Sequence, residues 1–422
     1  MCRFFVPFAL ALTAFAGSSA LAQQSIGVPT SPISASATPT SLTLAVAIQT
    51  ALDNNPELSA ARLEVEATLG ARTQASVFQN PTLSAQIEDL KRDTRTTTVL
   101  LSQPIELGGK RSARIEAAER ATDVARVQLE GKQAELRASV TAAFFAALIA
   151  QERVLLAQRS LDLAGRGSQA ATNRVLAGKV SPIEETKAKV AEAGVRVESI
   201  QARGELTTSL QQLQALMGRP VSFQRVDGDA VAMPGRIPAD TLEQRLMNSP
   251  SVRQSRLEVR RFTALADLEQ AKRTPDITLT AGGMRDQQLG RNQAVIGVSI
   301  PLPFFDTNSG NIVEALRRQD KAEDEARGVE LRLRADVGAA RQRYETALAE
   351  VNVLQSEVLP GAQAAFDAAT KGFELGKFAY LDVLDAQRTL LQARAQYLRA
   401  LADAHRSITD LDRLLGGPSS QS

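Results

Sequence analysis

Histidine, cysteine and tryptophan are almost missing from the 422-residue sequence, which contains one His, one Cys and no Trp. The histidine is His405 and the cysteine is Cys2. A Cys/His metal centre and a thiol nucleophile are therefore nearly excluded, because the atoms that would build them are absent. A lone histidine in a helical run is more often a packing residue than a ligand. We predict no catalytic, cofactor-binding or metal-ligating residue.

Aromatic residues and net charge are also scarce. Aromatic side chains make up 4% of the chain, and its 49 basic residues nearly balance its 47 acidic ones. No bulk charge indicates a nucleic-acid partner. The residues that are abundant, chiefly Ala, Leu, Arg, Glu and Gln, are typical of long helices. Enzymes are the function class with least support, since no set of catalytic side chains converges.

The first 22 residues have the pattern of a secretory signal peptide. Arg3 supplies a positive charge, residues 4–15 are apolar, and Ala20-Leu21-Ala22 is a small-x-small cleavage site. Cys2 would leave with the peptide, so we do not expect it to anchor a lipid. No later stretch of about 18 apolar residues occurs, and the sequence predicts an exported protein without a membrane-spanning helix. Residues 23–40 are rich in Ser, Thr and Pro, which predicts a flexible segment.

The rest of the chain contains two copies of one design. The tetrapeptide RLEV at Arg62–Val65 recurs at Arg256–Val259, an offset of 256 − 62 = 194 residues, and further landmarks follow in the same order. The ordered set indicates a tandem duplication. The predicted division is repeat 1 at 41–218, an inter-repeat segment at 219–239, repeat 2 at 240–416 and a tail at 417–422.

Each repeat is predicted to contain an interrupted helix, a β-hairpin, a long helix and a shorter return helix. In repeat 1 these are 44–77 with a break at Pro56, 81–104, 111–173 and 182–217. In repeat 2 they are 240–272 with a break at Pro250, 275–301, 311–371 and 380–415. A helix of about 60 residues is about 90 Å long, so no single globular domain can bury it and the helices must pack on one another.

The four short strands raise a physical question if they meet lipid. Open sheet edges are not tolerated in hydrocarbon, and transmembrane barrels need about eight strands or more. Several chains would therefore have to share one barrel. The alternative that the residues leave open is a soluble coiled-coil protein with two hairpins at one end.

The stretch QPIELGGKR at 103–111 resembles a phosphate-binding loop only superficially. That motif needs a glycine where Pro104 stands and a Ser or Thr where Arg111 follows Lys110. Gly108 and Gly109 instead predict a sharp elbow between a strand and a helix, with Pro104 ending the strand. We expect Lys110 and Arg111, which are poorly placed for the helix dipole, to face lipid head groups.

The second repeat has its own proline- and glycine-containing elbow in PLPFFDTNSGNIVEA at 301–315. Its predicted elbow residues are Pro301, Pro303 and Gly310. Together with QPIELGGKR and with ELGKFAYLDVLDAQRTLLQA at 374–393, this stretch resembles the TolC-type outer-membrane efflux family. QPIELGGKR and PLPFFDTNSGNI most resemble the branch of CzcC-like outer-membrane components of heavy-metal RND efflux systems.

The resemblance implies a mainly α fold with a β-hairpin pair and a homotrimer. Three chains would form a twelve-stranded outer-membrane β-barrel continuous with a long periplasmic α-helical barrel. An equatorial belt would surround its middle, built from the chain ends and the inter-repeat segment.

The implied function is a passive outer-membrane channel. An inner-membrane RND transporter and a periplasmic membrane-fusion adaptor would deliver the substrate, and outer-membrane lipid would surround the barrel. Heavy-metal cations are the cargo that the branch implies. Two alternatives stay open: the same channel exporting drugs or other organic compounds, and a soluble periplasmic helical adaptor.

The candidate pore residues are acidic. Asp382 and Asp385 are three residues apart and share a helix face, and Glu184 is the counterpart of Asp382 in the first repeat. The resemblance implies that these carboxylates ring the pore entrance, where they would attract cations. The residues alone support equally a helix-capping role, since carboxylates are favoured in a first helical turn.

The candidate tip contacts surround two Gly-Lys turns, Gly178-Lys179 and Gly376-Lys377. In the multidrug prototype of the family a tyrosine and an arginine latch this tip. Phe373 and Phe378 occupy the matching positions here. We therefore expect any closure of the tip to depend on apolar packing.

Overall fold

The computed structural model describes residues 41–219, 223–233 and 238–417. The predicted signal peptide, the 23–40 segment and all but the first residue of the 417–422 tail lie outside these residues. So do two parts of the inter-repeat segment. The described chain from residue 41 onward belongs to one compact unit.

Two of the helical stretches are split where prolines occur. The first contains α1 (Leu44–Asn54) and α2 (Pro56–Ser76), and the corresponding one in the second repeat contains α5 (Ala239–Met247) and α6 (Pro250–Ala271). Asn55 caps α2, since its Oδ1 accepts from the N–H groups of Glu57 and Leu58 at 2.9 and 3.1 Å. Proline fits the first position of a helix because its missing N–H would be unpaired there anyway. The breaks are therefore new helix starts rather than kinks.

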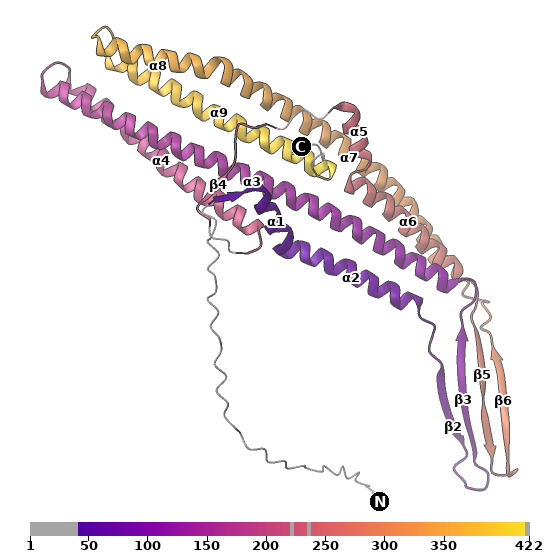
Figure 1. Cartoon of the computed structure of the whole chain (residues 1–422). Coiled ribbons are helices and arrows are strands. Elements are labelled where there is room, and N and C mark those ends of the chain that lie inside the picture. The colour runs from indigo at the N-terminus through magenta and orange to yellow at the C-terminus, as the bar shows by residue number, and fades with distance from the viewer. Residues whose placement is uncertain (1–40, 220–222, 234–237, 418–422) are drawn as a thin grey trace, which may run out of the picture. The chain divides into compact units, whose positions relative to one another are not determined.

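The long helices run side by side and are joined in pairs by short turns (Figure 1). In repeat 1, α3 (Lys110–Leu176) is followed by α4 (Pro182–Leu216). In repeat 2, α7 (Ser309–Val353) continues through a π-helical turn (Leu354–Val358) into α8 (Leu359–Glu374), and α9 (Tyr380–Leu415) returns. With 67 residues, α3 is about 100 Å long.

Pro360 explains why only the second long helix contains a π turn. A proline inside a helix lacks an N–H, and its ring clashes with the carbonyl four residues earlier. The π turn ends at Val358, two residues before the proline. The wider turn accommodates Pro360 and lets α8 continue in nearly the same direction.

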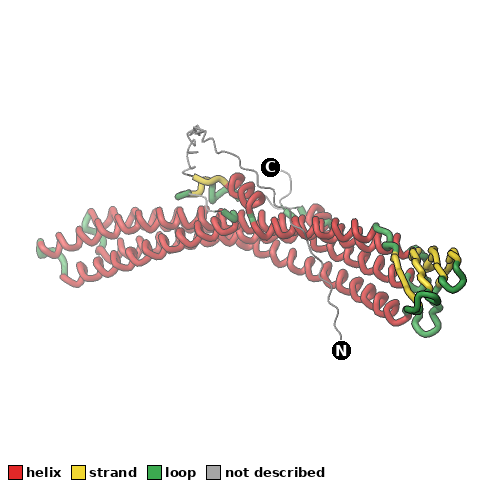
Figure 2. The backbone as a smooth tube through the Cα atoms, turned by 90° about the horizontal axis from the view of Figure 1, so that it is seen from below, coloured by secondary structure: helices red, strands yellow, loops and turns green. Residues whose placement is uncertain are grey.

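Helix α3 is the centre of the packing: it contacts α2 and α4 of its own repeat and α6 and α9 of the other. Figure 2 shows this bundle with the strands beyond one end of it. The main apolar cluster includes Val140, Phe144, Leu213 and Leu401, all at most 1% exposed. Alanine is frequent among the buried residues, which lets long helices approach closely.

The inter-repeat segment is attached to the middle of α3. Strand β4 (Arg225–Asp227) pairs in parallel with β1 (Ser41–Thr43). The side chain of Gln151 in α3 accepts from Val226 N at 2.7 Å and donates to Val226 O at 3.0 Å. The start of repeat 1 and the inter-repeat segment thus meet at one level of the helices.

The sequence predicts no helix able to span a membrane, but one described helix is long and apolar enough to do so, judged by length and composition alone. Among the described residues α3 contains an 18-residue window with a mean hydropathy of 1.6, of which 39% is buried. This is weak evidence for a membrane span. The apolar residues Val140, Phe144 and Leu148 of α3 belong to the main cluster, which gives the hydropathy a packing explanation.

The two hairpins form one antiparallel sheet with the strand order β2-β3-β5-β6. The strands are β2 (Thr82–Glu88), β3 (Thr96–Ile105), β5 (Ile277–Asp286) and β6 (Arg291–Ser299). β3 pairs with β5 over its full length although its sequence alternates poorly. Strands β2 and β6 are the open edges of the sheet.

Candidate functional site

One face of the sheet is apolar and exposed. Directly opposed residues of an antiparallel ladder point to the same face, so the register assigns both faces. Leu83, Leu101, Ala281 and Ile296 form one row across all four strands. Ile296 is 85% exposed and Leu83 71%. The same face also carries Ala85, Ile87, Val99, Ile277, Leu279 and Val298.

The opposite face is mainly polar. Ser84 pairs with Leu100, and Ser102 pairs with Thr280, whose hydroxyl lies 3.1 Å from that of Ser102. A sheet with one exposed apolar face, one polar face and two open edges has the properties of a segment of a transmembrane barrel. It cannot stay in hydrocarbon alone, because both edges would leave unpaired N–H and C=O groups.

Gly108 and Gly109 form the elbow between β3 and α3. Both residues are in the left-handed region, with φ of 67° and 74°. A Cβ on Gly108 would lie 2.5 Å from the Cβ of Thr274, three residues after the end of α6. Gly108 is therefore required both by its backbone conformation and by the close approach of the other repeat. The prediction that Pro104 ends the strand is wrong, because Pro104 is paired with Thr278 and β3 continues to Ile105.

The elbow of the second repeat turns on a different residue from the predicted Gly310. Asn308 has φ of 58° and precedes α7, whereas Gly310 lies inside the first turn of that helix. Asparagine tolerates the left-handed region, and its Nδ2 donates to Glu269 O at 2.8 Å. Pro301 and Pro303 lie in the irregular segment between β6 and Asn308, where they end the strand ladder.

The prediction that Lys110 and Arg111 face lipid head groups is wrong for these side chains as the structure places them. Lys110 Nζ lies 2.7 Å from Asp276 Oδ1, and its side chain is 12% exposed. Arg111 donates to Ser76 O at 2.8 Å and lies over the ring of Phe78. Both cations join elements that are distant in sequence, which a reading of the local motif cannot reveal.

Arg114 completes this junction, and no local motif indicates its role. It donates to Ala75 O at 3.0 Å and forms an ion pair with Glu106 at 2.5 Å. Hydrogen bonding to Arg114 holds the pKa of the Glu106 carboxyl below its usual range, although burial raises it. Together Arg111 and Arg114 pair with carbonyls at the end of α2, as basic side chains do at helix C-termini.

The tip turns have the same geometry in both repeats. Gly178 and Gly376 adopt φ of 67° and 71°. Lys179 N donates to Arg174 O at 2.9 Å, and Lys377 N donates to Gly372 O at 2.8 Å. These bonds close a Schellman motif, in which a left-handed glycine ends a helix. The Gly-Lys pairs are therefore turn residues that connect the helices of each pair.

Aromatic packing joins the two tip turns. The Phe373 ring lies 5.4 Å from that of Tyr380, and the Arg174 guanidinium lies 4.2 Å from the Phe373 centroid. Tyr380 is buried beside Gly167, where a Cβ would meet its hydroxyl. Phe378 packs in the same way on Gly372. The roles of Arg174, Tyr380 and Gly167 could not be predicted from local sequence, because they depend on contacts between the repeats.

The acidic tip residues serve the helices that carry them. Asp382 accepts from Ala379 N at 2.9 Å and so caps α9, and Asp385 is paired with Arg388 at 2.7 Å. Glu184 lies in the first turn of α4 and is half-buried. Capping occupies one oxygen of Asp382 and leaves its charge in place. The contacts within one chain do not bring Asp382 and Glu184 together.

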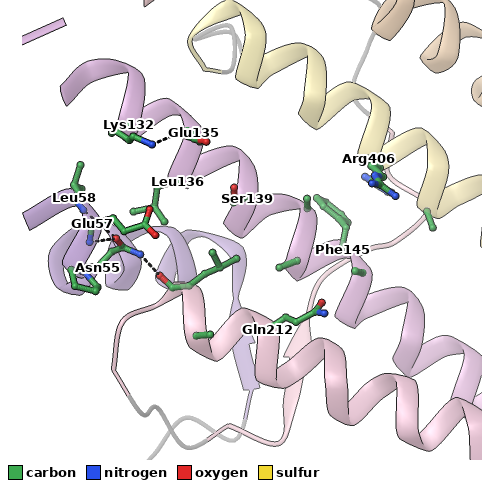
Figure 3. Close-up of a pocket in the computed structure, with 18 of the residues that line it drawn as sticks. Asn55, Glu57, Leu58, Lys132, Glu135, Leu136, Ser139, Phe145, Gln212 and Arg406 are labelled. Carbon is green, nitrogen blue, oxygen red and sulfur yellow. Dashed lines mark hydrogen bonds and ion pairs between the residues drawn. The ribbon is translucent and has the colours of Figure 1, made fainter. Parts of the chain in front are cut away.

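A hollow of about 820 Å³ lies between the start of α2 and helices α3, α4 and α9 (Figure 3). His405 is 2% exposed, stacks on Phe145 with 3.8 Å between ring centroids, and its Nε2 lies 2.8 Å from Ala230 O. Burial lowers the pKa of His405, so the neutral ring donates to that carbonyl. His405 thus attaches the inter-repeat segment. In the described part of the chain no three His, Cys, Asp or Glu residues are grouped to hold a metal.

Comparison with known families decides between the two architectures that the sequence left open. The model of the outer membrane efflux protein family matches twice, at residues 47–219 and 241–417, once in each repeat. The chain belongs to the outer membrane efflux protein family. Members of this family are channel components, and the soluble-adaptor alternative is therefore set aside.

Relatives support the same assignment. The chain is 45% identical over 417 residues to the cobalt-zinc-cadmium resistance protein CzcC of Cupriavidus metallidurans, covering 99% of this chain and all of that one. The nickel and cobalt resistance protein CnrC of that organism is 30% identical over 248 residues, 59% of this chain and 58% of its own. The outer membrane protein VceC of Vibrio cholerae has the same fold, with a TM-score of 0.76, 19% identity and coverage of 89% and 96%.

Membership of this family indicates how the sheet is oriented in the cell envelope. The protein is located in the outer membrane, and an exposed apolar face is the kind of surface that a barrel presents to lipid. The helices extend to the periplasmic side, so the two hairpin turns opposite them lie toward the exterior.

Proposed function

We propose that three copies of this chain form a passive channel that releases heavy-metal cations delivered by an inner-membrane RND transporter and a periplasmic membrane-fusion adaptor. The observation that supports the metal cargo is the 45% identity with a cobalt-zinc-cadmium resistance protein over nearly the whole chain. Drug or organic cargo is the competing proposal, since the solved structures share the fold at low identity.

The open sheet supports the trimer. One chain supplies four strands with the edges β2 and β6 unpaired. The smallest transmembrane barrels have about eight strands, and side chains fill their interior. A barrel that holds a water-filled channel needs more strands than that. Three chains supply twelve strands, and β6 of each chain can pair with β2 of the next until the ring closes.

A groove near the tip is the proposed contact surface for the adaptor. It lies between α4 and α9 and has a volume of about 770 Å³. Ala188, Ala191 and Gly194 line one side and Leu384 and Leu391 the other. Small residues facing leucines allow a further helix to approach closely.

The acidic residues of the tip are the proposed cation-attracting ring. Three chains would place the carboxylates of Asp382 and Asp385 around one axis. Asp385 and its partner Arg388 are both about 70% exposed, so solvent screens their ion pair and the carboxylate can also meet hydrated cations.

Changing Asp382 and Asp385 together to Asn should lower the preference of the channel for cations by roughly fivefold. A carboxylate at about 4 Å stabilises a cation by about 1 kcal/mol in water. Asparagine keeps an oxygen that can accept from Ala379 N, so the α9 cap is retained. Reversal potentials of single channels in a salt gradient measure the effect. Asp320→Asn with Asp324→Asn, in α7, is the matched control, and equal selectivity in all three proteins would refute the ring.

The cargo is tested by deleting the gene and measuring growth across zinc, cobalt, cadmium, nickel, copper and silver salts and a panel of organic toxicants. We expect sensitivity to at least one divalent metal and unchanged tolerance of the organic compounds. The opposite pattern would favour the organic-cargo alternative.

A further inference from the structure

Two arginines stand at the exterior end of the lipid-facing sheet surface. Arg285 of β5 is directly opposite Thr97 of β3, in the row that continues the apolar face beyond Val99. Gln287 N donates to Arg95 O at 3.1 Å, which extends the same ladder past the end of β3. Arg95 and Arg285 are therefore diagonal neighbours on one face, with Cβ atoms roughly 7 Å apart.

The structure gives these cations no anionic partner. Within the described residues, Arg95 and Arg285 form no ion pair, and Arg285 donates only to Asn292 Oδ1 at 3.0 Å. The Nε atom of Arg95 is shielded from solvent and has no acceptor. Two like charges on adjacent strands repel each other, and an anion between or beside them would relieve that repulsion.

Two of the three carboxylates at the hairpin turns are engaged in the turns themselves, and among the described residues the third, Asp93, forms no ion pair with Arg95 or Arg285. Asp89 accepts from Thr94 and from Lys91 N, and Asp286 accepts from Leu289 N at 3.0 Å. Asp286 also pairs with Arg291 in the ladder, on the polar face of the sheet. The outward positive charge is thus left for a ligand from outside the chain.

We infer that Arg95 and Arg285 bind a phosphate group of the phosphorylated glycolipid of the outer leaflet, lipid A. Two arginine side chains present several N–H donors in fork geometry, which matches phosphate oxygens. The acyl chains of the same lipid lie along the continuous apolar surface of Ile87, Val99 and Leu101. The site is therefore positioned at the boundary between hydrocarbon and head groups, independently of the cargo that the channel conducts.

Native mass spectrometry of the purified trimer with added lipid A tests the inference. Arg95→Ala with Arg285→Ala should reduce bound lipid A at least about tenfold, since the charge-assisted hydrogen bonds from both guanidinium groups to the phosphate are lost. Dephosphorylated lipid A should bind the unchanged protein as weakly as lipid A binds the double variant. Phosphatidylglycerol has one phosphate but two acyl chains, so its binding shows whether a phosphate alone suffices. If it binds as tightly as lipid A, the assignment to the glycolipid is overturned.

Arg291→Ala is the matched control for Arg285→Ala. Both arginines are exposed at the same end of adjacent strands, but Arg291 lies on the polar face. Arg291→Ala should keep lipid A binding, and Arg285→Ala should weaken it severalfold. Equal binding by these two variants would overturn the inference. Heat-modifiable trimers on gels establish that each variant has folded, and Arg285→Gln replaces Arg285→Ala if the latter fails to assemble.

Discussion

Ile296→Arg is expected to abolish the folded protein in the outer membrane, while Val295→Arg is expected to leave it in place. Ile296 is more exposed than Leu83 and Leu101 in its row on the apolar face, and Val295 points to the polar face opposite Gly282. An arginine facing lipid at the bilayer midplane costs about 2–4 kcal/mol. In a shared barrel each substitution occurs three times, which raises the cost to about 6–12 kcal/mol.

The measurement compares heat-modifiable trimers in the outer-membrane fraction for the two variants. The two substitutions are adjacent in one strand and introduce the same side chain. Any difference in the amount of trimer therefore reflects only the face of the sheet on which the arginine lies. Equal amounts of trimer, or a greater loss with Val295→Arg, would mean that the register assigns the lipid-facing side wrongly.

Gly108→Ala should lower the stability of the trimer far more than Gly109→Ala. Both glycines have positive φ, which costs an alanine about 1–2 kcal/mol. Only at Gly108 would the new Cβ lie 2.5 Å from Thr274, whereas at Gly109 its nearest atom is Ser112 Oγ at 3.3 Å. Forcing an extra carbon into a filled space adds about 1–3 kcal/mol.

Thermal dissociation of purified trimers is the appropriate measurement for this pair. Gly108→Ala should dissociate at a clearly lower temperature than Gly109→Ala, which in turn should lie slightly below the unchanged protein. If the two variants dissociate at the same temperature, the backbone at the elbow is more deformable than its geometry implies. The contact between the repeats at Thr274 would then not be tight.

The helices were predictable because their ends carry local signals. Pro182 and Pro250 start helices, Gly178 and Gly376 end them, and the predicted range 380–415 coincides with α9. Those residues act through their own backbone angles, which do not depend on the rest of the fold. The strand pattern was weaker, and β3 is a strand mainly because β2 and β5 pair with both its edges.

The functions of individual side chains were less predictable. Lys110 and Arg111 were expected at lipid and instead contact Asp276 and Ser76, which are distant in sequence. The left-handed residue of the second elbow is Asn308 and not Gly310, because a side-chain bond to Glu269 helps to hold it there. The residues that a long polar side chain contacts depend on how the repeats pack together. No local pattern in a single sequence shows those contacts.

The most direct test of the proposed efflux function is the amount of metal retained by cells. Cells with the gene deleted, but with pump and adaptor present, are loaded with zinc, cobalt or cadmium and measured by elemental mass spectrometry. We expect them to retain more metal than complemented cells, with Val295→Arg restoring release and Ile296→Arg failing to do so. Equal metal content in deleted and complemented cells, with the complementing protein present as trimers in the outer membrane, would contradict the metal-efflux function.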